Sequence, residues 1–125
     1  MHIVLYKPDI PQNNAAIIRL GACLNLNIHL IEPCGFNLND SRFKRVVMDY
    51  MGLCKVVRHE DFKSFLKKND MLLFGRESAG VPAEIHRMLK NKIKIPINKK
   101  TRSLNVAMSV AIVTAEALRQ NNLLK

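Results

Sequence analysis

The chain has 125 residues, 48% of them hydrophobic, and carries a formal net charge of +10. This length and apolar content predict one globular domain and exclude a disordered chain. The basic excess indicates an anionic partner, most commonly nucleic acid, and is compatible with a ribosomal or structural RNA-binding protein.

The cysteines and histidines predict neither a disulfide framework nor a metal site. Cys23, Cys34 and Cys54 are odd in number and widely spaced, and the four histidines make no metal-ligand spacing with them. We therefore expect reduced thiols in a cytoplasmic protein without a metal. The longest apolar stretch, residues 104–118, is too short to span a bilayer, so no membrane is expected.

The first thirty residues predict a βαβ unit. Residues 2–7 and 27–31 are typical of strands, and residues 11–24 have helical periodicity, with Asn13 or Asn14 near the N-cap. A short crossover of this kind indicates a parallel sheet, so the expected class is α/β.

The middle of the chain continues the alternation of helices and strands. The predicted elements are a helix over residues 42–50 capped by Asn39, Asp40 or Ser41, a strand over 55–58, an amphipathic helix over 61–68 and a strand over 70–74. The last strand is a short apolar run without alternation, which predicts burial on both faces.

A loop bracketed by Gly75 and Gly80 follows this strand, and a helix is predicted to start around Val81 with Pro82 in its first turn. The glycines allow a sharp turn and a close approach to a ligand. Ligands of open α/β sheets bind at the carboxyl ends of strands, where this loop is expected. The loop matches neither a Walker A motif nor a Rossmann fingerprint, and an ordinary strand-to-helix turn remains the alternative.

The C-terminal part predicts a helix over residues 83–90, an edge strand over 92–97 and a long helix ending near Asn121. Ser103 and Asn105 are candidate caps for the long helix. This helix is apolar nearly all round, so it must be covered on two sides. The sheet covers one side, and a second copy of the chain is expected to cover the other.

Three segments, Ile10–Leu20, Leu73–Pro82 and Ile95–Ala111, read together resemble the SpoU branch of the SPOUT methyltransferase superfamily. Within that branch the chain is most similar to small single-domain enzymes that methylate the ribose 2′-hydroxyl of the tRNA wobble nucleotide. The resemblance covers nearly the whole chain, and the order of the three motifs makes it specific.

The resemblance implies a parallel sheet flanked by helices, with a C-terminal deep trefoil knot, in a single domain over residues 1–125. It implies S-adenosylmethionine as cofactor, tRNA as substrate, and a homodimer formed through the first and C-terminal helices. The residues that it places at the cofactor are Gly75, Glu77, Gly80, Ile95, Ser103 and Leu104.

The resemblance also assigns Arg19 to the ribose 2′-hydroxyl. A guanidinium, with a pKa above about 12, stays protonated and is poorly suited to act as a general base. Arg19 would instead hold a phosphate or stabilise the developing alkoxide. A solvated helix position is the alternative. Arg42, Lys44, Arg45 and Arg102 are candidate RNA-binding residues, although such charges are often only a solvated face.

One departure from the family pattern concerns residues 67–70, which join helix and strand directly. Relatives carry another strand and a loop here, so an internal deletion, a sheet one strand shorter and a more open adenosine pocket are predicted. Two functions follow. The retained motifs favour a tRNA ribose 2′-O-methyltransferase, and the missing loop favours a degenerate homologue that binds RNA as a dimer.

Overall fold

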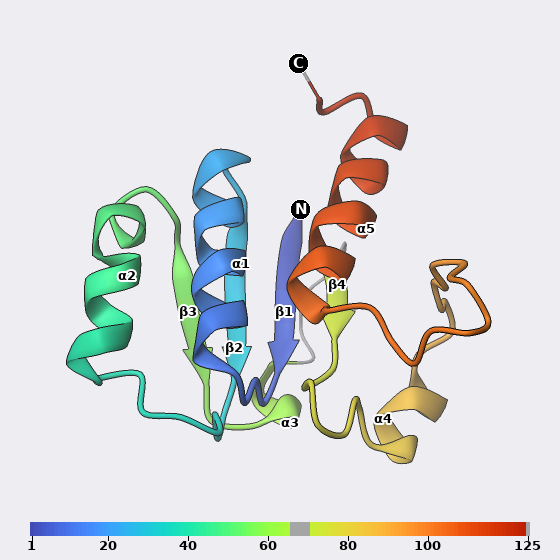
Figure 1. The fold of residues 1–125 in the computed structure, drawn as a ribbon, viewed down its shortest axis with the longest axis horizontal. Helices are drawn as coiled ribbons and strands as arrows, with labels where there is room; N and C mark the ends of the chain where they lie inside the picture. The colour runs from blue at the N-terminus through green and yellow to red at the C-terminus, as the bar shows by residue number, and fades with distance from the viewer. Residues whose placement is uncertain (66–70, 125) are drawn as a thin grey trace.

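The structure is a computed structural model that describes residues 1–65 and 71–124. In these residues four strands form one parallel sheet, in the order β3-β2-β1-β4. The strands are β1 (His2–Tyr6), β2 (Asn27–Ile31), β3 (Val56–His59) and β4 (Met71–Phe74). The predicted parallel α/β class is confirmed, and the carboxyl ends of all four strands meet at one edge (Figure 1).

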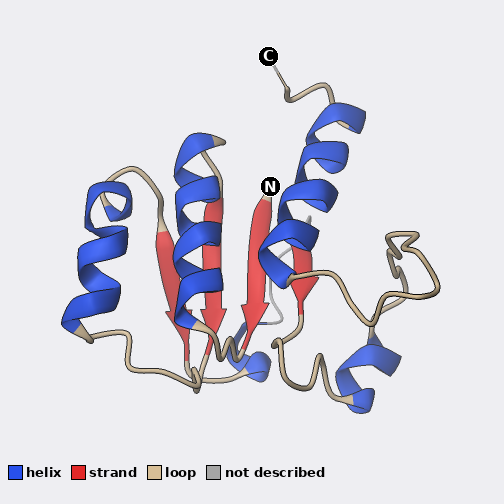
Figure 2. Cartoon of the chain, viewed as in Figure 1, coloured by secondary structure: helices blue, strands red, loops and turns tan. Residues whose placement is uncertain are grey.

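The described helices are α1 (Pro11–Cys23), α2 (Ser41–Met51), α3 (Phe62–Phe65), α4 (Ala83–Met88) and α5 (Val106–Gln120). Figure 2 shows α1, α2 and α5 side by side in front of the sheet, with the short α3 behind its lower edge. None of the described helices is long and apolar enough to cross a membrane.

The alternation of β1 side chains divides the core between the two faces of the sheet. Ile3 and Leu5 pack in one cluster with Ile17 of α1 and Val110 of α5. Val4 and its neighbours pack in another cluster, with side chains from α3 and α4 on the opposite face. Full burial of each large aliphatic side chain contributes about 1.5–3 kcal/mol, so α1 and α5 are held firmly on the sheet.

Helix α2 packs on α1 rather than on the centre of the sheet. Phe43 and Val47 of α2 form a buried cluster with Ala15 and Ile18 of α1. The side chain of Asp40 caps α2 by accepting a hydrogen bond from the Arg42 N–H at 2.8 Å, which confirms one of the three predicted caps.

Two strand predictions need correction. The described residues 92–97 form no strand, and Ile93 among them is 68% exposed. The edge strand predicted there from the alternation of charged and apolar residues is therefore wrong. The segment from residue 89 to 105 is a long loop. In addition, β4 is half-buried along its length instead of covered on both faces, because among the described strands it pairs only with β1 and so lies at an edge.

Helix starts also differ from prediction. Helix α1 begins at Pro11 and its N-cap, Ile10, makes no side-chain cap, so neither Asn13 nor Asn14 serves there. Asn105 caps α5 by accepting from the N–H groups of Ala107 and Met108, whereas Ser103 lies two residues before this cap. The predicted helix over 61–68 and the strand start at residue 70 fall partly outside the described residues.

Candidate active site

The loop after β4 is tight because of its two glycines. The Gly80 N–H donates to the Arg76 carbonyl at 2.8 Å, and the Arg76 N–H donates back to the Gly80 carbonyl at 3.3 Å. Gly80 has a φ of 65°, which L side chains rarely adopt. A Cβ on Gly75 would lie 2.5 Å from the Gly80 carbonyl carbon, so the backbone approach requires glycine at residue 75.

Asp9, in the turn after β1, anchors this loop. Its Oδ1 accepts from the Glu77 N–H at 3.1 Å, and its Oδ2 accepts from Arg76 Nη2 at 3.3 Å and from the Ser78 hydroxyl. The hydrogen bonds from Glu77, Ser78 and Arg76 together hold the pKa of Asp9 well below its ordinary value. The carboxylate therefore stays ionised and fixes the loop against the carboxyl end of β1.

Glu77 extends the same network toward α1 and α5. Its carboxylate accepts from the Asp9 N–H at 3.2 Å and from Asn13 Nδ2 at 3.1 Å. Asn105 Nδ2 in turn donates to Asn13 Oδ1 at 2.9 Å. Three segments that are distant in the sequence thus meet at the carboxyl edge of the sheet, where ligands of open α/β sheets bind.

The predicted cofactor residues lie partly in this place. Gly75, Glu77 and Gly80 form the loop itself, while Ser103 and Leu104 directly precede Asn105 and are exposed. Ile95 lies in the segment 89–105, which leaves α4, extends to the right of the sheet and returns to α5 (Figure 1).

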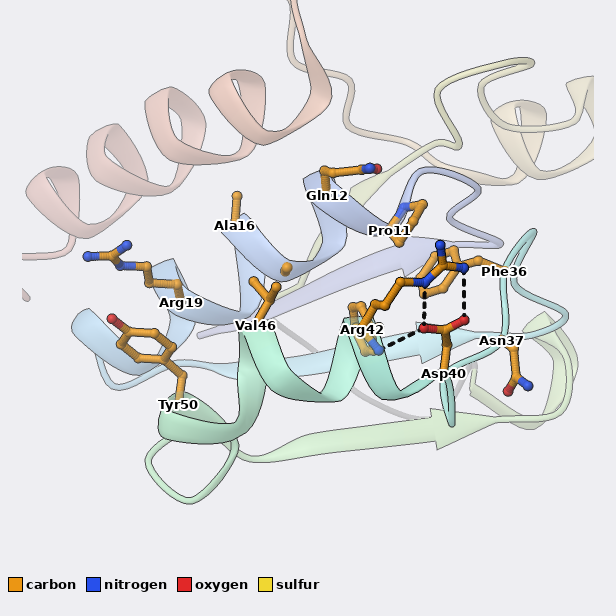
Figure 3. A pocket seen from close by; sticks show the side chains of 12 residues that line it. Pro11, Gln12, Ala16, Arg19, Phe36, Asn37, Asp40, Arg42, Val46 and Tyr50 are labelled. Atoms are coloured by element: carbon orange, nitrogen blue, oxygen red, sulfur yellow. Dashed lines mark hydrogen bonds and ion pairs between the residues drawn. The ribbon is translucent and has the colours of Figure 1, made fainter.

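Arg19 lies elsewhere on α1. It is eight residues past the start of the helix, a distance of about 12 Å along the axis. Its guanidinium carbon stands 5.2 Å from the centre of the Tyr50 ring of α2, a cation–π contact between the two helices (Figure 3). Within one chain, Arg19 therefore contacts α2 and lies about two helical turns from the start of α1.

A cavity of about 570 Å³, which we call the α1–α2 cavity, opens between these helices and the loop before α2. Arg19 and Tyr50 stand at one end, and Arg42, paired with Asp40 at 3.3 Å, stands at the other (Figure 3). Phe36 belongs to the apolar part of its lining. The guanidinium of Arg42 holds the pKa of Asp40 below its ordinary value, so both groups are charged.

The candidate RNA-binding residues come from two separate parts of the chain. Arg42, Lys44 and Arg45 are exposed on α2, whereas Arg102 is exposed in the segment 89–105, which extends on the side of the sheet away from α2 in Figure 1. No group of three or more His, Cys, Asp or Glu side chains suited to a metal occurs among the described residues.

Sequence reasoning missed Asp9 and the structural role of Asn13 in this site. Asp9 follows Pro8 at the end of a predicted strand, and its partners are 67 to 69 residues away in the sequence. The one available signal was position, since polar groups after a buried parallel strand gather at its carboxyl edge.

The sequence matches a known protein family along most of its length. The profile of the SpoU rRNA Methylase family matches residues 1–70 and residues 64–115. A tRNA (cytidine(34)-2′-O)-methyltransferase from Ancylobacter novellus is 38% identical over 144 aligned positions, which cover 94% of this chain and 91% of the relative. The aligned length exceeds the 125 residues of the chain, so the chain lacks residues that this relative has.

Solved structures share the fold. One, described as giving structural insights into the 2-OH methylation of C/U34 on tRNA, has a TM-score of 0.89 and 34% identity, and the match covers 97% of this chain and 95% of that one. An AdoMet-bound rRNA methyltransferase from Sinorhizobium meliloti has a TM-score of 0.83 at 22% identity, over 95% of this chain and 56% of the other. The second match concerns the fold alone.

Proposed function

The chain belongs to the SpoU rRNA methylase family, and from this premise we propose that it is a tRNA ribose 2′-O-methyltransferase acting at nucleotide 34. The observation that carries the proposal is the 38% identity to a methyltransferase of that specificity across 91% of the relative's length. Residues 1–125 would act as one catalytic domain, working in the cytoplasm where tRNA is processed.

The proposed cofactor is S-adenosylmethionine. It supplies a methyl group bound to a sulfonium sulfur, and the resulting thioether is a good leaving group. The glycine loop suits a ligand, because no atom of the described residues beyond its chain neighbours lies within 4 Å of the position that a Cβ on Gly80 would take. Backbone groups beside such an open side can meet the polar edges of an adenosine. We assign the cofactor to this loop and to the start of α5, through Gly75, Glu77, Gly80, Ser103 and Leu104, with Ile95 from the segment 89–105.

Arg19 is the proposed catalytic residue. Its permanently charged guanidinium would hold the substrate ribose and stabilise negative charge that develops on the 2′-oxygen as the hydroxyl loses its proton. Because Arg19 lies about 12 Å along α1 from the start of that helix, we propose that it acts at the cofactor of a partner copy.

A homodimer through α1 and α5 supports this arrangement. The side of α5 that carries Val110, Thr114 and Leu118 is buried against the rest of the chain. Met108 and Ile112, on other sides of the same helix, are 58% and 49% exposed in one copy. Large apolar side chains on a helix of low polarity favour a self-complementary interface, which a two-fold dimer provides.

Two finer points are also part of the proposal. We propose that the segment 89–105 threads as the trefoil knot of this superfamily, with support from the match of the chain to a solved relative over 97% of its length. We also propose that the missing residues leave the sheet one strand shorter. The two matched parts of the family profile overlap at residues 64–70, the place where a deletion was expected.

The test is methyl transfer from labelled S-adenosylmethionine to a panel of tRNA transcripts, with the product mapped by nucleoside mass spectrometry. The expected product is a single 2′-O-methylated nucleotide at position 34, the position acted on by the relative. The control is the same RNA with a 2′-deoxyribose at that position, which must accept no methyl group because it lacks the 2′-hydroxyl. A folded protein that binds these RNAs and transfers no methyl group would overturn the proposal in favour of an RNA-binding homologue.

A further inference from the structure

The α1–α2 cavity is not explained by cofactor binding at the glycine loop. Its volume of about 570 Å³ lies within the range of small-ligand sites, roughly 300–1,000 Å³. It opens between two helices that are fixed to each other by the buried cluster around Phe43 and Val47. The cavity is therefore preformed and of a size that holds a nucleoside.

The walls of the cavity have the chemistry of a base-binding slot. Ala16 and Val46 contribute aliphatic side chains to the lining, and Phe36 and Tyr50 add aromatic rings. Phe36 itself packs against Phe43 with ring centres 5.2 Å apart, which fixes its orientation. Aromatic and aliphatic surfaces of this kind stack on unpaired bases of any sequence.

The charges sit at the two ends of the slot. Arg19 lies over Tyr50 at one end, where it would meet the ribose. Arg42 lies at the other end, where it could meet a phosphate of a strand that passes across the opening. Asp40, the one acidic residue among the described residues of the lining, is already paired with Arg42. An apolar slot with Arg19 at one end and the Arg42–Asp40 ion pair at the other fits a nucleotide better than it fits an acidic metabolite or an apolar peptide.

We propose that the α1–α2 cavity binds the unpaired base of the nucleotide whose ribose is methylated. This inference rests on the proposed function, since it takes Arg19 to act at the ribose 2′-oxygen. A base is attached to the same sugar as that oxygen, and Arg19 lines the cavity, so a ribose held at Arg19 directs its base into the slot. The cavity would thus select single-stranded substrate, because a paired base cannot enter it.

The test fills the slot without altering its charges. Val46 and Met48 are both exposed on α2, at 63% and 70%, but only Val46 lines the cavity. We compare Val46→Trp with Met48→Trp as the matched control. Each protein is titrated by fluorescence anisotropy with an anticodon stem-loop RNA and with the same RNA carrying an abasic ribose at the target position.

Wild type and Met48→Trp should bind the abasic RNA about tenfold or more weakly than the intact RNA, the usual effect of one lost stacking contact. Val46→Trp should bind both RNAs equally and weakly. Equal binding of the two RNAs by wild type, or a base preference that survives in Val46→Trp, would overturn the inference.

A second pair of variants, at Tyr50, keeps the test valid if Val46→Trp fails to fold. Tyr50→Ala should lose the base preference, and Tyr50→Phe should keep it because the ring remains. Binding is measured without methyl transfer, so the outcome is separate from that of the proposed function. A protein that methylates tRNA but shows no base preference refutes only the cavity assignment.

Discussion

Asp9 and Glu77 exchange two hydrogen bonds: the N–H of each donates to the carboxylate of the other, at 3.2 and 3.1 Å. The pair joins the turn after β1 to the glycine loop after β4. Through Asn13, Glu77 is linked further to Asn105 at the start of α5. The proposed cofactor site is therefore one connected polar network rather than a free loop.

Asp9→Asn should destabilise this network in a pH-dependent manner. The pKa of Asp9 is lowered in the folded state by its hydrogen bonds from Glu77, Ser78 and Arg76. Its stabilising contribution is therefore fully present above its ordinary value of about 4, and is lost as the pH falls below that value toward the folded-state pKa. A hydrogen bond to a charged group contributes about 1.5–3 kcal/mol, so the variant should lose a comparable free energy of unfolding at neutral pH.

The measurement is urea unfolding of wild type and Asp9→Asn across the acid range. The variant should show a shallower loss of stability below about pH 4 than wild type. Asp49→Asn, a change at an exposed aspartate of α2, is the matched control and should leave the profile unaltered. Identical acid profiles for wild type and Asp9→Asn would remove Asp9 from its anchoring role.

Cys34 should react with an alkylating reagent more slowly than Cys23. Burial and the neighbouring Glu32 carboxylate raise the pKa of Cys34 to about 11, and the side chain is only partly exposed. Cys23 is exposed. In iodoacetamide time courses followed by peptide mass spectrometry near neutral pH, Cys23 should be modified well before Cys34, because the thiolate is the reactive form. Equal rates would contradict the environment that the structure gives Cys34.

The exposed side of α5 should form a dimer interface. We expect sedimentation at micromolar protein to give a dimer for wild type and a monomer for Met108→Arg, because a charge would be buried without a partner. Met48→Arg is the control, since Met48 is also exposed, at 70% against 58% for Met108, but lies on α2 outside the proposed interface. A wild-type monomer would refute the packing argument.

Arg19→Ala should abolish methyl transfer while the affinity for the cofactor is kept. If Arg19 acts on the partner's cofactor, then mixing Arg19→Ala chains with Gly75→Ala chains should restore activity. Each mixed dimer would hold one complete site, made of the intact loop of one copy and Arg19 of the other. Activity should reach a fraction of the wild-type rate, measured after refolding the two variants together. Failure to complement would place Arg19 and the cofactor in the same chain.

The βαβ start, the parallel sheet and the glycine loop could be predicted because local periodicity and turn chemistry determine them. The strand expected over residues 92–97 was wrong because alternation alone does not supply a pairing partner, and β4 already forms the edge of the described sheet. The half-burial of β4 has the same origin, since a short apolar run does not reveal what covers it.

The site was predictable only where a motif lies in one segment. Gly75, Glu77 and Gly80 could be assigned to the cofactor as a prediction because they lie within one six-residue loop motif, whereas Asp9 was missed because its partners are almost seventy residues away. The contact of Arg19 with Tyr50 likewise joins two helices through tertiary packing. No single segment carries that information, so the α1–α2 cavity had no local signature.

Calorimetric titration of the purified protein with S-adenosylmethionine tests the central claim most directly, with Gly75→Ala as the control. We predict micromolar binding of one cofactor per chain, and its loss in the variant, because the new Cβ would lie 2.5 Å from the Gly80 backbone and displace the loop. Absence of binding by a folded, dimeric wild-type protein would mean that the missing residues are essential to the cofactor site. The chain would then be an RNA-binding homologue rather than a methyltransferase.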